Sequence, residues 1–269
     1  MFQKFAAGDG VLSNEAFVQE EVEHNLIHMI STFEDSTKIK SDDNQLIFAH
    51  SKGFNPWLWV SKELDPDQRS VWVKELVNQV KDDSFPGISA EPNTARLFAE
   101  SFCEGRGALF HTNMILVAYH CPELIQLDKV NGYMLQATVE HSADIAEFMA
   151  GFSEDALGVA AVPQSFLTAA EEAARSGDLY LWIVDETPVS MAKIGHLSAR
   201  HGRINLVYTP LTHRKKGYAS ATVAGVCSKL LQENITPMLY ADGKNPDSNK
   251  VYQSIGFIET GRIADIKFD

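Results

Sequence analysis

The chain has 269 residues, 45% of them hydrophobic and 22% charged, which is the composition of a globular protein able to bury a core. A formal net charge of −13 at pH 7 disfavours nucleic acid as a partner, because nucleic-acid-binding proteins present a basic face. No apolar run approaches the roughly 18 residues of a membrane span, and the first residues lack the apolar core of a secretory signal. We therefore expect a cytoplasmic protein with neither a nucleic-acid nor a membrane partner.

The cysteines indicate structural thiols rather than a metal site. Cys103, Cys121 and Cys227 are widely spaced and odd in number, and no CxxC pair occurs. A zinc site or a disulfide framework needs paired or closely spaced cysteines. We expect reduced thiols and no bound metal.

The first half of the chain alternates helical and strand patterns. Apolar residues keep helical spacing over 13–34, with Ser13 as the N-cap, and Pro66 favours the start of another helix. The expected helices are 13–34, 66–83 and 93–104, and the expected strands are 46–50, 56–63, 87–91 and 114–121. The glycine-rich segment CEGRGA, 103–108, follows no strand, so we interpret it as a turn and not as a cofactor loop.

A connector at 122–133 leads into a second series of elements. We place a domain boundary there, with an N-terminal α/β domain at 1–130 and a second domain at 131–269. The second series has strands at 134–140, 179–186, 189–199, 204–209 and 237–242, helices at 142–152, 163–177, 217–234 and 246–256, and a strand or hairpin at 257–268. We expect Ser142 to cap its helix, and turns at Thr187–Pro188 and at 201–203.

A basic turn connects the strand 204–209 to the helix that starts at Gly217. The first N–H groups of a helix have no internal acceptor, and they carry the positive end of the helix dipole. Gly217 allows a close approach of the backbone, while Arg214, Lys215 and Lys216 supply positive charge. The arrangement predicts an anion site that fits a pyrophosphate, although neither a P-loop nor a GxGxxG motif is present.

Two motifs of the second half resemble those of the GNAT superfamily of N-acetyltransferases. RKKGYA, 214–219, matches the acyl-CoA-binding pattern of Gln or Arg, then x-x-G-x, then Gly or Ala. NPDSNKVYQSIGF, 245–257, matches the second motif, which has an Asn after a strand, an Asn in the next helix, a Tyr three residues later and a closing Gly-Phe. The resemblance implies an α/β (α+β) fold whose C-terminal half is a mixed, mostly antiparallel sheet flanked by helices.

The first half fits the GNAT pattern less well. Its element order is that of either a degenerate GNAT-like copy or a partner domain. A partner domain ahead of a GNAT-like one is also the arrangement of acyltransferases of the glycine N-acyltransferase kind, so an FR47-like subgroup of that type is an alternative.

The resemblance implies that both motifs bind acetyl-CoA. The backbone of the strand before the turn would pair with the pantetheine arm, the turn would bind the pyrophosphate, and two asparagines would contact the arm. The implied cofactor-binding residues are Leu206, Val207, Tyr208, Thr209, Arg214, Lys215, Lys216, Gly217, Tyr218, Ala219, Ser220, Asn245, Asn249 and Tyr252. The structural alternatives are an ordinary core strand and helix capping by the asparagines.

Tyr252 is the implied catalytic residue. Acetyl transfer to an amine expels a CoA thiolate, which the Tyr252 hydroxyl would protonate as a general acid. The alternative is a buried aromatic side chain on an amphipathic helix. Backbone N–H groups near Val207 and Tyr208 would stabilise a tetrahedral oxyanion.

The general base is left unassigned by the sequence. Many GNAT proteins carry a Glu on the strand before the turn, and this strand has Arg203 and Asn205 on that face. Side chains that could replace the Glu, each better explained as structural, are His196, His201, Glu172 and Asp185.

These features predict an N-acetyltransferase that moves an acetyl group from acetyl-CoA to a primary amine of a small molecule or peptide in a ternary complex. No cysteine near the motifs suggests an acyl-enzyme. The alternative from another class is an acyl-CoA-binding sensor that has lost catalysis, which the missing strand carboxylate favours. We expect a monomer or a homodimer.

Overall fold

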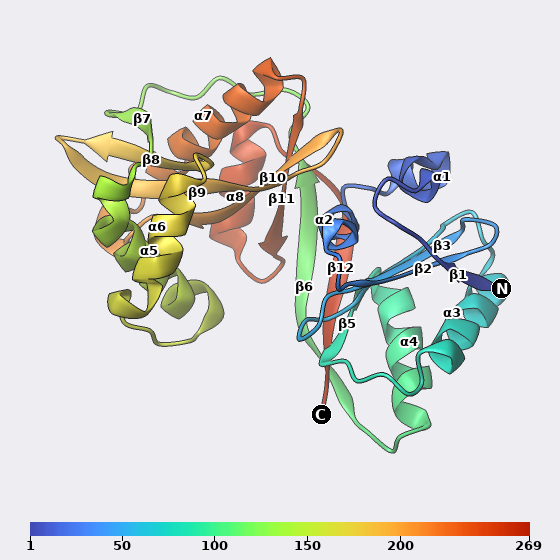
Figure 1. The fold of residues 1–269 in the computed structure, drawn as a ribbon. Coiled ribbons are helices and arrows are strands. Elements are labelled where there is room, and N and C mark those ends of the chain that lie inside the picture. The colour runs from blue at the N-terminus through green and yellow to red at the C-terminus, as the bar shows by residue number, and fades with distance from the viewer. The chain divides into compact units, whose positions relative to one another are not determined.

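A computed structural model describes residues 1–269, apart from the side chain of Leu157 (Figure 1). The chain divides into two compact units. Unit 1 comprises Met1–Tyr119, Tyr240–Pro246 and Glu259–Asp269, and unit 2 comprises His120–Leu239 and Asp247–Ile258. The chain therefore passes between the units several times, and three of its strands have residues in both. The boundary at residues 130 and 131 stays a prediction.

Unit 1 is built on a sheet with helices on both faces. Its elements are β1 (Phe2–Lys4), α1 (Glu15–Gln19), α2 (Leu26–Thr32), β2 (Thr37–Ser41), β3 (Leu46–His50), β4 (Trp57–Val60), α3 (Pro66–Gln79), β5 (Gly87–Ala90), α4 (Pro92–Glu104) and β6 (Phe110–His120). Strands β1 to β4 pair as antiparallel neighbours in chain order, and β4 pairs in parallel with β5. The last strand of the chain, β12 (Ile258–Phe268), pairs antiparallel with β5.

The continuous apolar strand β3 is explained by burial on both of its faces. Phe48 packs in a core cluster with side chains of α3 and α4, whereas its neighbour Ile47 packs in a second cluster with side chains of α1 and α2. Successive side chains of a strand point to opposite faces, so a strand covered on both sides must be apolar throughout. The predicted strand at 46–50 has the bounds of β3.

Unit 2 repeats this plan. Its elements are β7 (Tyr133–Gln136), α5 (Ser142–Leu157), α6 (Leu167–Arg175), β8 (Leu179–Val184), β9 (Thr187–Leu197), β10 (His201–Tyr208), α7 (Tyr218–Gln232), β11 (Thr236–Asp242) and α8 (Pro246–Ile255). Strands β7 to β10 pair antiparallel in chain order, and β10 pairs in parallel with β11. The mixed, mostly antiparallel sheet predicted for the second half is confirmed.

The two halves of the chain have the same order of elements. Each runs strand, two helices, three strands, helix, strand, helix, strand, and each pairs its first four strands antiparallel and its fourth and fifth in parallel. This order favours the degenerate GNAT-like copy over an unrelated partner domain for the first half. The repeat is not apparent in the sequence, because the alternation of apolar residues is common to many sheets.

Several local predictions were wrong. The single helix over 13–34 is interrupted at residues 20–25, and α1 is capped by the side chain of Asn14, which accepts from the Ala16 N–H at 2.9 Å, not by Ser13. Residues 201–203 begin β10 and are not a turn. The turn after β8 is at Asp185–Glu186, with φ of 46° and 61°, and Thr187 already belongs to β9.

The predicted cap of the first helix of unit 2 also differs from the structure. Ser142 is the first residue of α5, and its hydroxyl donates to the Val139 carbonyl at 2.7 Å instead of capping the helix. The segment after α8 is the single strand β12, which is one of the two alternatives predicted for 257–268. Among the described residues, no helix is long and apolar enough to cross a membrane.

Candidate functional site

The end of β10 departs from regular pairing. Its pairing with β11 joins His201–Arg203 to Thr236–Met238, whereas β10 itself continues to Tyr208. Its pairing with β9 shifts register between Asn205 and Tyr208, where Leu206 has a φ of 48°. A β-bulge of this kind bends a strand and redirects its backbone groups. The predicted pantetheine-binding residues Leu206, Val207, Tyr208 and Thr209 lie in or directly after this bulge.

Neighbouring elements hold the bulged end of β10 in place. The Ser190 hydroxyl on β9 donates to the Tyr208 carbonyl at 3.2 Å, and the Thr209 hydroxyl donates to Ser190 Oγ at 2.9 Å. The Tyr208 side chain lies against Gly151 of α5, at the place that a larger residue's Cβ would occupy. Gly151 is therefore needed in the middle of a helix, where glycine is otherwise unfavourable.

The N-terminus of α7 is open to a ligand. Its N-cap is Gly217, which has a φ of 82° and provides no side-chain hydrogen bond to the helix. Lys215, Lys216 and Gly217 are exposed, while Tyr218, Ala219 and Ser220 are half-buried in the first turn. Unsatisfied N–H groups, the helix dipole and two adjacent lysines together favour an anion. The pyrophosphate role of this loop stays a prediction.

The corresponding helix of the first half, α3, is closed. The Asp65 carboxylate accepts from the Gln68 N–H at 2.8 Å, the Gln68 side chain bonds the Asp65 N–H at 3.4 Å, and Asp67 adds a negative charge in the first turn. This capping box occupies the donors that an anion would need. The start of α3 is therefore closed by side chains, whereas the start of α7 has no side-chain cap.

Arg214 is held by a residue that the sequence did not single out. Its guanidinium contacts the Asp155 carboxylate of α5 at 2.5 Å, and its Nε donates to the Thr209 carbonyl at 2.9 Å. The Tyr208 hydroxyl donates to the same Asp155 oxygen at 3.2 Å. Burial and the adjacent Asp155 carboxylate raise the pKa of Tyr208. Arg214 thus connects the turn to α5 and β10. Arg214 and Asp155 are 59 residues apart in the sequence.

The residues of the second motif lie on and before α8. Asn245 directly precedes the helix, and its N–H donates to the Asp242 carbonyl at 3.0 Å. Asn245 belongs to unit 1, whereas Asn249 and Tyr252 belong to unit 2. Tyr252 is 8% exposed and packs edge-on against Phe257, with ring centroids 5.8 Å apart. Burial raises its pKa to about 12. The hydroxyl is therefore protonated at neutral pH, as an acid must be, but its proton is harder to release.

The candidate bases are spread over four places. His196 lies on β9, opposite Arg203 of β10. His201 is the first residue of β10, and its N–H donates to Ser198 Oγ at 3.1 Å. Asp185 lies in the hairpin turn between β8 and β9, and Glu172 is exposed on α6. Because these side chains lie on different elements, their positions do not identify one of them as the general base.

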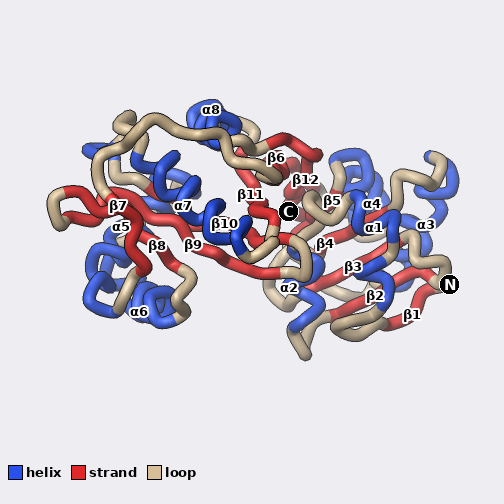
Figure 2. The backbone as a smooth tube through the Cα atoms, turned by 90° about the horizontal axis from the view of Figure 1, so that it is seen from above, coloured by secondary structure: helices blue, strands red, loops and turns tan.

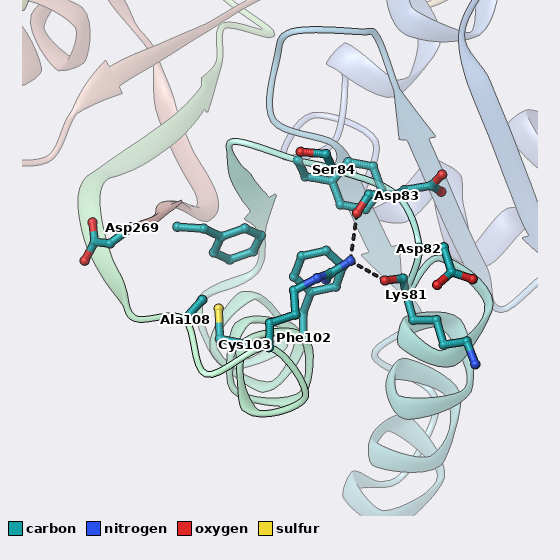
Figure 3. A pocket seen from close by; sticks show the side chains of 11 residues that line it. Lys81, Asp82, Asp83, Ser84, Phe102, Cys103, Ala108 and Asp269 are labelled. Carbon is teal, nitrogen blue, oxygen red and sulfur yellow. Dashed lines mark hydrogen bonds between the residues drawn. The ribbon is translucent and has the colours of Figure 1, made fainter.

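The glycine-rich segment 103–108 ends α4 and turns, as predicted. It borders a cavity of about 530 Å³ in unit 1, which includes Phe102, Cys103 and Asp269 in its lining (Figure 3). The Arg106 guanidinium lies 3.5 Å from the centre of the Phe102 ring and donates to the carbonyls of Lys81 and Asp83. Arg106 thus fastens the turn to the end of α3, which is a structural role.

The connector between the halves lies along α7, and Figure 2 shows it as a loop that runs from α8 towards β7. It encloses a mainly apolar cavity of about 460 Å³ with Trp182 and the small residues Ala221, Ala224 and Gly225. Val130 lies 3.0 Å from the position that a Cβ at residue 217 would take. A side chain at position 217 would therefore contact the connector. The φ of 82° at this position would also strain the backbone of any residue other than glycine.

Comparison with known proteins agrees with this architecture. Residues 180–263 match the family described as FR47-like protein. A GNAT-family acetyltransferase from Colwellia psychrerythraea is similar over 100% of both chains, with 13% identity and a TM-score of 0.58. The chain has the GNAT fold. A GCN5-related N-acetyltransferase from Sphaerobacter thermophilus covers 100% of this chain and 95% of its own, with 11% identity and a TM-score of 0.59.

A tandem GNAT protein from the clavulanic acid biosynthesis pathway is also similar over the full length. It covers 100% of this chain and 98% of its own, with 12% identity and a TM-score of 0.50. No curated protein sequence matches the chain. The GNAT fold thus extends over both halves, and it is a fold that typically binds acetyl-CoA. Among the residues that the structure describes, no group of three or more His, Cys, Asp or Glu side chains is arranged to hold a metal ion.

Proposed function

We propose that the chain is an N-acetyltransferase that transfers the acetyl group of acetyl-CoA to a primary amine in a ternary complex. The observation that carries the proposal is the N-terminus of α7, which has no side-chain cap and has Gly217 at a φ of 82°. It follows the bulged end of β10 through a short 3-10 helix, Leu211–His213, and the basic turn. An open helix N-terminus with adjacent lysines suits a diphosphate. A bulged strand end leaves backbone groups free to pair with an extended arm.

The residues that would hold the cofactor are those of the β10 end, the turn and α8. Lys215, Lys216 and the N–H groups of 217–220 would bind the diphosphate, and the backbone of 206–209 would pair with the pantetheine arm. Asn249 and Asn245 would add polar contacts to that arm. Acetyl-CoA supplies the activated thioester when it is bound.

The chemical step needs a proton donor and a site for negative charge. We propose that the Tyr252 hydroxyl protonates the departing thiolate and that N–H groups near Val207 and Tyr208 stabilise the tetrahedral oxyanion. A phenol held in a dry environment keeps its proton at neutral pH and is therefore present as a donor when the thiolate departs. The burial of Tyr252 is consistent with that behaviour.

A second candidate function is an acyl-CoA-binding sensor without catalysis. It is favoured by β10 itself, which carries Arg203 and Asn205 where a catalytic carboxylate would be expected. An acyltransferase of the glycine N-acyltransferase kind is a variant of the first proposal. Release of free CoA thiol from acetyl-CoA in the presence of a panel of amines separates a transferase from a sensor.

The direct test of the cofactor is calorimetry with acetyl-CoA and with desulfo-CoA. Both should bind without added metal. Gly217→Val should abolish binding in a protein that remains folded, because valine is strained at a φ of 82° and its side chain would meet Val130. Unchanged affinity in folded Gly217→Val would refute the assignment.

A further inference from the structure

We propose that the cavity between the connector and α7 binds an adenine ring, which belongs to the acetyl-CoA whose diphosphate lies at the start of α7. The link to acetyl-CoA rests on the proposed transferase function, whereas binding of an adenine nucleotide to the cavity does not. Every residue that the proposal uses belongs to unit 2. The connector, which contains no helix or strand, would thereby be part of the cofactor site.

The cavity has the size and the walls of a small-molecule site. Its volume is about 460 Å³, and its lining is mainly apolar. Pockets of about 300–1,000 Å³ with apolar walls are typical of ligand sites in proteins. Leu127 and Val130 line it from the connector, and Ala221, Ala224 and Gly225 line it from α7. Three small residues on one side of the helix leave the room that larger side chains would fill.

Two contacts hold the connector at the border of the cavity. The Ile125 N–H donates to the carbonyl of Ile255, the last residue of α8, at 2.9 Å. The indole N–H of Trp182 donates to the Asn131 carbonyl at 2.8 Å. The connector is therefore fixed on both sides of residues 126–130, and the cavity needs little rearrangement to receive a ligand.

The lining favours a flat aromatic ring without charge. The indole N–H of Trp182 is engaged by the connector, so what Trp182 offers a ligand is its ring and not a donor. Nucleobases stack on aromatic side chains of this kind. Asp128 is the charged residue of the lining, so a phosphate group is disfavoured inside the cavity because like charges repel.

A polar side chain in the lining distinguishes adenine from a hydrocarbon. Gln126 is exposed, and its side chain makes no hydrogen bond among the residues that the structure describes. A Gln amide has a donor and an acceptor side by side, which match the amino group and the adjacent ring nitrogen of adenine. Aliphatic walls, an aromatic ring and a free amide together complement an adenine ring.

Val130 connects the cavity with the turn before α7. Val130 lines the cavity, and its Cγ2 lies 3.0 Å from the position that a Cβ at residue 217 would take. Ala221 is also in the lining, about one helical turn from Gly217. In acetyl-CoA a single ribose separates the diphosphate from the adenine. A diphosphate bound at 217–220 therefore leaves the adenine within reach of the cavity.

The test is calorimetric titration with adenosine 5′-monophosphate, with uridine 5′-monophosphate as a control that has the same phosphate and a smaller base. The wild-type protein should bind the adenosine nucleotide about tenfold more tightly. Ala224→Leu should weaken its binding at least about tenfold, because leucine would fill the cavity. Ala224→Ser keeps the side chain small and should retain the affinity. Gln126→Ala should weaken binding about fivefold, because the hydrogen bonds to the base are lost.

Equal affinity of the wild type for the two nucleotides would overturn the proposal, as would equal affinity of Ala224→Leu and Ala224→Ser for adenosine 5′-monophosphate. Circular dichroism establishes whether Ala224→Leu folds. If it does not, Gln126→Ala decides alone, because this position is exposed and its substitution leaves the core intact. Unchanged affinity in Gln126→Ala would then overturn the proposal.

Titration of the same variants with acetyl-CoA separates the two possible sources of the adenine. Acetyl-CoA affinity should also fall at least about tenfold in Ala224→Leu. If only adenosine 5′-monophosphate binding is weakened, the cavity serves a free nucleotide and the link to the cofactor is overturned. A wild-type protein that binds adenosine 5′-monophosphate in the cavity but not acetyl-CoA would refute the proposed function and retain the adenine site. Binding of acetyl-CoA without preference for the adenosine nucleotide would refute only the adenine site.

Discussion

Removing the Asp155 carboxylate should weaken acetyl-CoA binding, although Asp155 is negatively charged and the cofactor is an anion. Asp155 holds Arg214 at 2.5 Å and accepts from the Tyr208 hydroxyl at 3.2 Å. If Arg214 acts by fixing the turn, Asp155→Ala frees the turn and the β10 end together. If Arg214 instead binds the diphosphate directly, the same substitution removes a competing carboxylate and binding becomes tighter. The sign of the effect therefore distinguishes the two roles.

The expected magnitude follows from the exposure of the pair. A charge-assisted hydrogen bond contributes about 1.5–3 kcal/mol when it is well shielded. The Arg214 and Asp155 side chains are 40% and 29% exposed, so solvent reduces this contribution, and about 1 kcal/mol is a reasonable value. Since about 1.4 kcal/mol corresponds to a tenfold change, acetyl-CoA affinity should fall about fivefold.

The assay is a double-mutant cycle measured by calorimetry. We expect about the same loss of acetyl-CoA affinity in three variants, Asp155→Ala, Arg214→Ala and the double variant. Each of them removes the same contact between Arg214 and Asp155. Glu154→Gln, which neutralises the exposed neighbour on α5, controls for the change in charge. Tighter binding of acetyl-CoA to Asp155→Ala, or additive losses in the double variant, would refute the claim that the Arg214–Asp155 contact fixes the turn.

Three other predictions follow from the same structure. One acetyl-CoA should bind per chain by calorimetry, and Asp65→Ala should lower the free energy of unfolding by about 1 kcal/mol without creating a second site, because it removes only the helix cap. Tyr252→Phe should lower kcat and kcat/KM together by about 10²–10⁴ with little change in acetyl-CoA affinity, and unchanged kcat in steady-state kinetics would identify a core side chain. Gly151→Ala should cost about 1–3 kcal/mol in chemical denaturation, because the new methyl group would collide with the Tyr208 side chain.

Much of the fold was predictable because its elements have clear periodicity or clear ends. Pro66 at the start of α3 and the apolar run of β3 placed those elements closely. Two short strands were missed, since Phe2–Lys4 has three residues and Thr37–Ser41 alternates with lysines. Neither provides a continuous apolar run, and both are strands because their neighbours in the sheet pair with them.

The break in the predicted helix over 13–34 has a tertiary cause. Residues 20–25 retain apolar spacing through Val22, and their helical pattern is therefore plausible in isolation. In the fold they turn, and the carbonyls of Val22 and Glu23 accept from the Tyr240 hydroxyl, which is more than 200 residues distant in the sequence. A pattern-based prediction cannot include a hydrogen-bond donor supplied by such a distant strand.

The candidate site was predictable only in part, for a related reason. Gly217 and its lysines form a local motif whose geometry depends on a few consecutive residues, and the sequence is sufficient for it. Asp155 acts on the motif from another helix, and a single exposed Asp has no sequence signal that separates it from its neighbours. Long-range partners of a motif, unlike the motif itself, require the fold.

The difference between α3 and α7 is the reason that we expect one anion site in a fold that is present twice. Both helices begin after the fourth strand of their half, so both have the same dipole and the same free N–H groups at the start. Asp65 neutralises these donors in the first half, whereas Gly217 leaves them open in the second. The two halves also differ in the charge that they bury, since buried carboxylates lie between the first two helices of the first half. The cap is therefore one of the features that make the start of α3 unsuitable for a diphosphate, and the glycine and the adjacent lysines before α7 have no counterpart before α3.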